Sequence, residues 1–338
     1  MRVRAVMLRI LRQLRHDKRT VALMIIAPIF VLTLMYFIFG VSNYHPKIGV
    51  INAPLSFVNK LEDKEAEVTR YSEGGAYVAI RDGKLDAIVD FQAGVPKIQF
   101  EGSDPNKSKG ALQLIQGALM PATQIGNFDT KYLYGYEDMT LFDNFGPILI
   151  GFFVFFFVFL ISGVSFLGER NTGTLERILA TPLRRWELVI GYTLGYGAFT
   201  IIQSAIIAWY SITVLNIMMI GSFFLVLVIT FLTAMVGLTI GTFVSAYADN
   251  ELQMVQFIPV IVIPQIFFSG LFDLSTMSPA LQALAKFMPL YYVADALRNI
   301  MIKGKGWEFI WFDVLILSLI CVFFIFANVI ALKKHRKI

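Results

Sequence analysis

The stretch FLGERNTGTLERILATPLRRWELVIG, residues Phe166 to Gly191, lies between two long apolar runs and is the most charged short segment in the second half of the chain. Gly173 can end a helix that arrives from the first run, and Pro182 can end the next helix. Residues 174–181 are therefore predicted to form a short amphipathic helix. Its apolar side would carry Leu175, Ile178 and Leu179, and its polar side would carry Glu176 and Arg177.

A short helix held between two membrane spans can act as a lever, because a push on it moves both spans. The residues after this helix, Arg184, Arg185 and Trp186, are of the types found where a chain re-enters a membrane. The alternative interpretation is an interfacial loop that only reverses the direction of the chain.

Composition indicates the class of protein before any motif is considered. Of 338 residues, 57% are hydrophobic and 31 are Phe, and the mean hydropathy is +0.66. Only 16% are charged, whereas a soluble domain carries about a quarter. Apolar runs of about 20 residues, the length that crosses a bilayer, recur along the chain. The predicted fold is an α-helical polytopic membrane protein with six transmembrane helices and a small α/β extracellular domain between the first and the second.

The segments expected from this pattern are a cytoplasmic amphipathic interfacial helix at 1–20, span 1 at 21–40, the extracellular α/β domain at 41–144, span 2 at 145–168, a cytoplasmic coupling helix segment at 169–187, span 3 at 188–215, span 4 at 223–246, span 5 at 252–271, an extracellular re-entrant hairpin at 272–308, span 6 at 309–332 and a basic cytoplasmic tail at 333–338.

The first 20 residues carry seven Lys or Arg residues against one acid, Asp17. Apolar residues at helical spacing fall on one face and arginines on the other. The apolar face consists of Val3, Val6, Met7, Ile10, Leu11 and Leu14. This pattern predicts a helix on the anionic cytoplasmic leaflet. A simple positive-inside anchor is the alternative, and both place the N-terminus in the cytoplasm.

Residues 44–143 differ from the rest, with 14 of the 24 acids and no membrane-length apolar run. Short strands are predicted at 47–52, 66–71, 86–91 and 97–102, with helices at 57–63, 75–82 and 109–125. Alternating strands and helices favour a small α/β domain. Its net acidic charge argues against nucleic-acid binding.

Cysteine and histidine usage predicts no disulfide and no metal site. Cys321 is the single cysteine, and His16, His45 and His335 are scattered along the chain.

Two regions of the second half depart from a plain span. Residues 272–308 carry two short amphipathic patterns broken at Pro289, too short to cross, which predict a re-entrant or interfacial hairpin on the outer face. The fifth span contains Gln253, Gln256 and Gln265, together with Pro259 and Pro264. Polar groups and freed carbonyls at membrane depth face protein or a wet cavity. They predict either the lining of a pathway or interhelical hydrogen bonds that only fasten the bundle.

These residues resemble a known family. The segment Glu169-Arg-Asn-Thr-Gly-Thr-Leu-Glu176, followed by Thr181-Pro182 and Gly191, is similar to the signature after the second span of type-2 ATP-binding-cassette (ABC) exporter permeases. The later run resembles that family's outer hairpin at Ser269-Gly270, Met277-Ser278-Pro279, Pro289-Leu290 and Asp295-Ala-Leu-Arg298. The domain between the first two spans resembles the subgroup that includes many drug and antibiotic exporters.

The resemblance implies that a separate ABC ATPase subunit, in two copies, drives the chain, which is then a permease and not an enzyme. The chain contains no G-x-x-x-x-G-K-[ST] phosphate-binding motif, so ATP and Mg would bind the partner and no cofactor would bind this chain. The residues expected to couple to the ATPase are Glu169, Arg170, Gly173, Thr174, Leu175, Glu176, Ile178, Thr181 and Pro182.

In the family two permeases pair, as a homodimer or with a sister permease, and the second and fifth spans of each line a central path. The substrate-pathway residues this implies are Phe152, Phe156, Gln253, Gln256, Pro259 and Gln265, and the outer-hairpin residues are Ser269, Gly270, Pro279, Pro289 and Arg298. An amphipathic, drug-like or lipid-like cargo is expected to leave the cell across a plasma membrane, in a bacterium, with both termini cytoplasmic.

Other functions remain open at this stage. The cargo could be a polysaccharide or an ion. The chain could instead be a signalling or scaffold protein whose extracellular domain senses a ligand. An intramembrane enzyme would need a catalytic pair at depth, and Asp313 near the outer edge is the nearest candidate.

Overall fold

The computed structural model describes residues 2–39, 45–64, 66–91, 96–101, 105–119, 140–272, 274 and 277–332. The basic tail expected at 333–338 and the last part of the helix expected at 109–125 lie outside these ranges. The chain divides into two compact units, Met1–Val41 with Tyr132–Ile338, and Ser42–Lys131.

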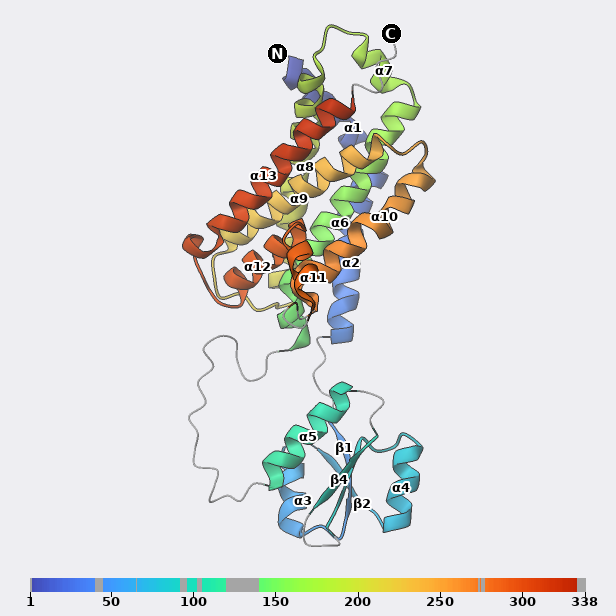
Figure 1. Ribbon diagram of the computed structural model, residues 1–338, viewed down its shortest axis with the longest axis vertical. Coiled ribbons are helices and arrows are strands. Elements are labelled where there is room, and N and C mark those ends of the chain that lie inside the picture. The colour runs from blue at the N-terminus through green and yellow to red at the C-terminus, as the bar shows by residue number, and fades with distance from the viewer. Residues whose placement is uncertain are drawn as a thin grey trace. The chain divides into compact units, whose positions relative to one another are not determined.

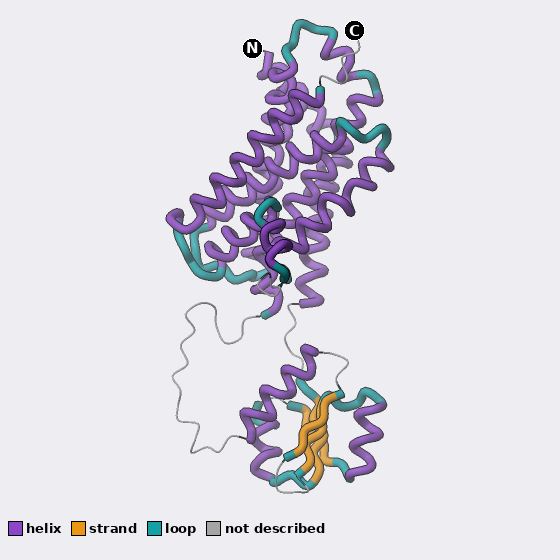
Figure 2. Tube along the Cα trace, in the orientation of Figure 1, coloured by secondary structure: helices purple, strands orange, loops and turns teal. Residues whose placement is uncertain are grey.

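The first unit is a helical bundle (Figures 1 and 2). Within the described ranges, six helices are long and apolar enough to cross a membrane, which confirms the predicted class. They are α2 (Lys18–Phe39), α6 (Leu141–Asn171), α8 (Arg185–Thr213), α9 (Phe223–Ser245), α10 (Glu251–Ile266) with its π-helical continuation η1 (Phe267–Leu271), and α13 (Trp307–Ala331).

Helix α6 is the most buried of the six, and its 31 residues measure about 46 Å at 1.5 Å per residue. The hydrocarbon core of a bilayer is about 30 Å thick, so the ends of α6 extend beyond it. The helix starts at Thr140, whose hydroxyl accepts from the backbone N–H of Asp143 at 3.1 Å. Its aromatic side chains then fill the core, with Phe155 and Phe159 stacked at 6.0 Å between ring centroids.

Helix α9 packs on α6 through glycine. A Cβ atom added at Gly237 would lie 2.8 Å from the carbonyl oxygen of Phe155, so the two backbones are in contact there. Gly241, one turn later, meets the backbone of Phe159 in the same way. The G-x-x-x-G spacing in α9 thus brings a span against the central helix without an intervening side chain.

Among the residues that the structure describes, four shorter helices belong to the bundle: α1 (Arg2–His16), α7 (Thr174–Leu179), α11 (Pro279–Ala285) and α12 (Pro289–Met301). Helix α1 forms where the amphipathic pattern predicts it, but its apolar seam faces protein. Val6, Ile10 and Leu14 are buried, and they pack against α8. The expected burial of this face in a lipid leaflet is therefore replaced by contact with α8.

The second unit is a small α/β domain. Its elements are β1 (Lys47–Ile51), α3 (Leu55–Glu62), β2 (Glu67–Arg70), α4 (Glu73–Arg81), β3 (Ala87–Asp90), β4 (Lys97–Phe100) and α5 (Pro105–Leu119). The strand order is β2-β1-β3-β4, with β1 parallel to both β2 and β3, and β4 antiparallel to β3.

Two small cores cover the two faces of this sheet. Helices α3 and α5 pack on one face around Val50 and Val89, and α4 packs on the other around Ile51 and Ile88 (Figure 1). The strands and helices all lie within or beside the ranges expected from the alternating pattern.

We expect Gly237→Ala to lower the free energy of unfolding of the bundle by about 1–3 kcal/mol, because the added methyl group forces α9 away from α6. Thermal unfolding of the purified protein in detergent measures this. Gly168→Ala is the matched control, since nothing lies within 4 Å of a Cβ at that position. An equal melting temperature for the two variants would contradict close backbone packing at Gly237.

Candidate functional site

The coupling segment, residues 169–187, connects α6 to α8 and contains α7. Helix α6 ends at Asn171 and is capped by Thr172, and Gly173 follows with φ 68°, a left-handed conformation that favours glycine. The chain then re-enters a helix, with the N–H of Arg177 donating to the carbonyl of Gly173 at 3.2 Å. Gly173 therefore makes the sharp bend that turns α7 away from the axis of α6.

Helix α7 has one anchored and one open side. Leu175 and Leu179 are buried in the core, whereas Glu176 and Arg177 are exposed. The helix is therefore amphipathic, as predicted. The other expected coupling residues are distributed accordingly: Thr174 and Ile178 are half-buried, and Thr181 and Pro182 are exposed.

Glu169 is buried at the end of α6, where it joins three helices. Its Oε2 atom lies 3.1 Å from Nη2 of Arg9 in α1, and the hydroxyl of Tyr192 in α8 donates to the same oxygen. Only 5% of the Glu169 side chain is exposed, against 35% for Arg9. A carboxylate this buried needs a cation and a hydrogen-bond donor, and it has both.

Arg170, the neighbouring residue, contacts a different helix. Its Nη1 atom donates to the carbonyls of Ser245 at 3.1 Å and Ala246 at 3.2 Å, and its Nη2 atom donates to the carbonyl of Ala248. These carbonyls lie at the C-terminal end of α9, where a helix has unsatisfied acceptors and a negative dipole end. Both expected contact residues at the base of α6 therefore bind other helices of this chain.

The N-terminal helix is attached to the same region at a second place. Nη1 of Arg2 donates to the carbonyl of Pro182 at 2.7 Å and lies 3.8 Å from Oε2 of Glu187. Glu187 also accepts from the backbone N–H of Arg184 at 2.7 Å, which starts α8. Sequence reasoning missed these contacts because about 180 residues separate the partners.

Two glycines of α8 allow α1 to approach. A Cβ atom at Gly191 would lie 2.6 Å from Cβ of Val6, and one at Gly195 would lie 2.7 Å from Cβ of Ile10. A spacing of four residues between two glycines permits close helix packing, and α1 is the partner here. Helix α1 is thus fixed to α8 by packing and to α6 by the Glu169 ion pair.

The six residues expected along a substrate pathway do not gather at one place. Phe152 and Phe156 are half-buried and stack at 5.9 Å on one face of α6. Gln253 lies in the first turn of α10, where its Oε1 accepts from the N–H of Asp249 at 2.6 Å. Gln256 and Pro259 are exposed on α10.

Gln265 is buried and fastens the outer hairpin. Its Oε1 atom accepts from the N–H of Leu290 at 3.1 Å, at the start of α12, and its Nε2 atom lies 3.3 Å from the sulfur of Met288. The alternative interpretation of the fifth-span amides, hydrogen bonds between helices, describes this glutamine. Of the three glutamines of this span, Gln256 is the one that is exposed.

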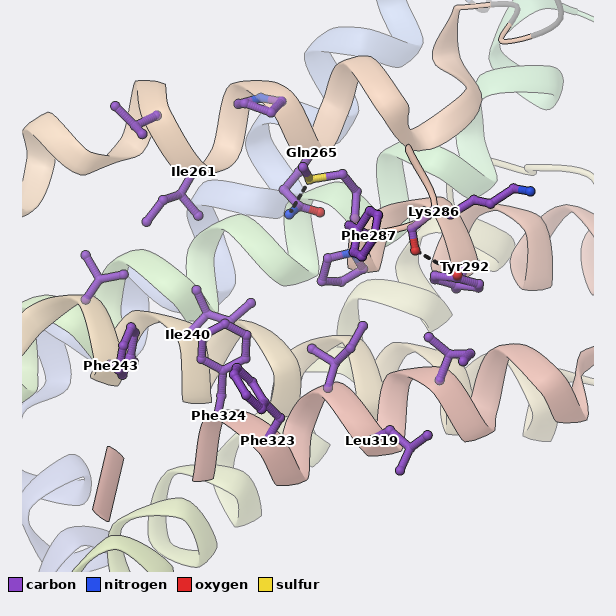
Figure 3. A pocket seen from close by; sticks show the side chains of 17 residues that line it. Ile240, Phe243, Ile261, Gln265, Lys286, Phe287, Tyr292, Leu319, Phe323 and Phe324 are labelled. Carbon is purple, nitrogen blue, oxygen red and sulfur yellow. Dashed lines mark hydrogen bonds between the residues drawn. The ribbon is translucent and has the colours of Figure 1, made fainter. Parts of the chain in front are cut away.

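A large cavity that sequence reasoning missed lies beside Gln265 (Figure 3). Its volume is about 750 Å³, within the range of small-molecule sites. It is lined by α9, α10, α13 and the start of α12 with the residues just before it, and its lining includes Ile240, Ile261 and Phe323. The polar groups at one end are Gln265 and Tyr292, whose hydroxyl donates to the carbonyl of Lys286 at 2.7 Å. Because four separate segments form it, no local pattern could predict it.

The outer-hairpin residues form two groups. Ser269, Gly270 and Arg298 lie together at a second, more polar cavity of about 470 Å³. Gly270 has φ 84°, and a Cβ there would lie 3.4 Å from Nη1 of Arg298. Pro279 and Pro289 instead occupy the first turns of α11 and α12, where a missing N–H has no cost.

These features define a class of protein: a polytopic helical membrane protein with a short amphipathic helix between its second and third spans. One side of that helix is buried and the other is exposed. The family model described as "ABC-2 family transporter protein" matches residues 18–330. The chain belongs to this family.

Curated relatives cover the chain to different extents. "ABC transporter G family member 20" of Dictyostelium discoideum is 27% identical over 211 residues, which are 62% of this chain and 29% of that protein. "Probable multidrug ABC transporter permease YbhR" of Escherichia coli K12 is 27% identical over 169 residues, 49% of this chain and 45% of the relative. YbhS, with the same description and organism, is 19% identical over 99% of this chain and 97% of its own length. The chain therefore spans less than half of the first two relatives and nearly all of the third.

A double-mutant cycle on Arg9→Ala and Glu169→Ala tests the attachment of α1 to α6. We expect a coupling energy of about 1–3 kcal/mol in detergent unfolding, because Arg9→Ala leaves the buried Glu169 carboxylate without its cation. The pair Arg2 and Glu187 is the control. Its atoms are 3.8 Å apart and Arg2 is 52% exposed, so its coupling should stay below about 1 kcal/mol. Additive effects at Arg9 and Glu169 would contradict the attachment.

Proposed function

We propose that this chain is the membrane subunit of an ATP-driven exporter, moved by a separate ATPase subunit that docks on α7. The observation that carries the proposal is that α7 is amphipathic. Its leucines are buried against the bundle while Glu176 and Arg177 are exposed. Membership of the ABC-2 family, in which permeases work with ATPases, supports the same conclusion.

The contacts at the coupling segment explain how a push on α7 would move the spans. Only Thr172 and Gly173 separate α7 from α6. Helix α6 is bound to α1 and α8 by Glu169 and to α9 by Arg170. A displacement of α7 is thus transmitted to α1, α6, α8 and α9 together. Two ATPase copies would bind ATP and Mg²⁺, while this chain supplies the moving spans.

A second permease would complete the pathway. Helix α10 has an exposed apolar face, where Leu252 is 69% exposed and Val260 is 70% exposed. Gln256 and Pro259 are exposed on the same helix. A like helix from a second copy, or from a sister permease, would cover this face and enclose a path that also reaches Phe152 and Phe156.

The cargo that fits is amphipathic, drug-like or lipid-like. The 750 Å³ cavity is lined mainly by apolar side chains with a few amide and hydroxyl groups at one end, a chemistry that suits such molecules. Two of the relatives carry the words "multidrug ABC transporter permease" in their names. We place the protein in a bacterial plasma membrane, with both termini cytoplasmic and the α/β domain outside. The basic residues of α1 and of 333–337 support this orientation.

Glu176→Arg should abolish ATP-driven export, because the reversed charge faces the docking ATPase while the buried side of α7 is unchanged. Gly173→Pro should have the same effect, since proline cannot adopt φ 68°. The measurement is uptake of a fluorescent amphipathic dye into inside-out vesicles that contain both subunits, together with the ATPase rate.

Glu62→Arg, an exposed charge reversal in the α/β domain, is the matched control and should export normally. Export by Glu176→Arg at the rate of this control would contradict docking on α7. Export by neither wild type nor variants, with ligand-dependent changes in the α/β domain, would favour the signalling alternative.

Two glutamines of α10 should respond differently to leucine. Gln256→Leu is expected to change the relative export rates of a panel of dyes with little effect on stability, because its amide is exposed on the proposed pathway. Gln265→Leu is expected to lower the free energy of unfolding by about 1–3 kcal/mol, because the N–H of Leu290 loses its acceptor. A Gln256→Leu effect limited to stability would contradict the pathway.

A further inference from the structure

An apolar recess lies at the corner between α1 and α2. Its volume is about 780 Å³, and α1, α2 and α8 all contribute to it. The lining along the spans is hydrocarbon, as at Ile25, Phe199 and Ile202. Two cations, Arg15 and Lys18, line it as well.

The two cations lie just before the apolar part of the first span. Arg15 is in the last turn of α1, and Lys18 is the first residue of α2. The apolar window of the first span begins directly afterwards, at Thr20. Both side chains are exposed. The acid between them, Asp17, accepts hydrogen bonds from the backbone and hydroxyl of Thr20 at 3.1 and 2.6 Å.

The packing of α1 on α8 leaves this recess accessible, and a lipid here can contact both charged and apolar side chains of α1. Val6, Ile10 and Leu14 of α1 are buried, and α1 packs on α8, so the helix cannot insert its apolar seam into a leaflet. Leu11 and part of Leu14 instead line the recess next to Arg15. Charge and hydrocarbon are therefore combined at this recess.

We propose that this recess binds one anionic phospholipid, with its phosphate between Arg15 and Lys18 and an acyl chain along α2 and α8. The inference rests on the proposed placement of the α1–α2 corner at the membrane surface. Basic pockets between membrane helices on the cytoplasmic side bind anionic headgroups, and each Lys or Arg near such a surface strengthens binding. A volume of about 780 Å³ is in the range of small-molecule sites, so the recess would hold the phosphate region and part of one acyl chain. Because α1 is bound to Glu169 and to Pro182, the lipid would stabilise the helix that holds the coupling segment.

The test is lipid selectivity of the purified permease, without its ATPase. The protein is reconstituted into phosphatidylcholine bilayers with spin-labelled phosphatidylglycerol or spin-labelled phosphatidylcholine, and the motionally restricted fraction gives a relative association constant. We expect wild type to prefer phosphatidylglycerol. Arg15→Gln with Lys18→Gln should reduce this preference about 25-fold, at about fivefold for each cation.

The matched control is Arg4→Gln with Arg12→Gln, which removes the same charge from exposed positions of α1 outside the recess. Its selectivity should stay within about twofold of wild type. An equal loss in both double variants would overturn the proposal, since it would assign the preference to the overall charge of α1. Unchanged selectivity in both would overturn it as well.

A second variant tests the apolar part. Ala22 lines the recess, and Ala22→Trp fills it while leaving both cations in place, so it too should abolish the preference. Disulfide crosslinking between two chains that carry Ala22→Cys would instead assign the recess to contact between copies and overturn the lipid site. None of these outcomes depends on export, which the dye-uptake experiment tests separately.

Discussion

The structure depends on one buried carboxylate. Glu169 sits at the end of the central helix, where Arg9 of α1 neutralises it and Tyr192 of α8 donates to it. Removing a carboxylate from water costs several kcal/mol unless such partners are present. These contacts stabilise the association of the three helices at this point, where the coupling segment begins.

Around this carboxylate, close helix packing and polar contacts both hold the coupling segment to the bundle. Gly191 and Gly195 let α1 touch α8, and Gly237 lets α9 touch α6, so the helices that meet the coupling segment are in direct contact. Arg170 adds a bond to the end of α9. The open side of α7 contributes no packing to the bundle, which is why a docked partner can use it without disturbing the core.

The sequence was sufficient for the features that rest on local patterns. Apolar runs predicted the six spans, and alternating strands and helices predicted the α/β domain. Gly173 predicted the start of α7, whereas the helix ends at Leu179, two residues before the end expected from Pro182. The contacts that decide the site are not local. Arg9 and Glu169 are 160 residues apart, and any of the basic residues of α1 could have been the partner. The partner of Gln265 was equally hidden, because a glutamine in an apolar run has the same pattern whether it faces a pathway or the N–H of Leu290.

The composition of α10 has a mechanical consequence. Pro259 and Pro264 each lack an N–H, so the carbonyls of Val255 and Val260 receive no bond from them. The π-helical turn at Phe267–Leu271, with Gly270 left-handed, interrupts the regular ladder again. This span therefore has a lower bending stiffness than α6, whose proline lies in its first two turns. Bending of the bundle would therefore concentrate in α10, and α12 would move with it because the N–H of Leu290 is bound to Gln265.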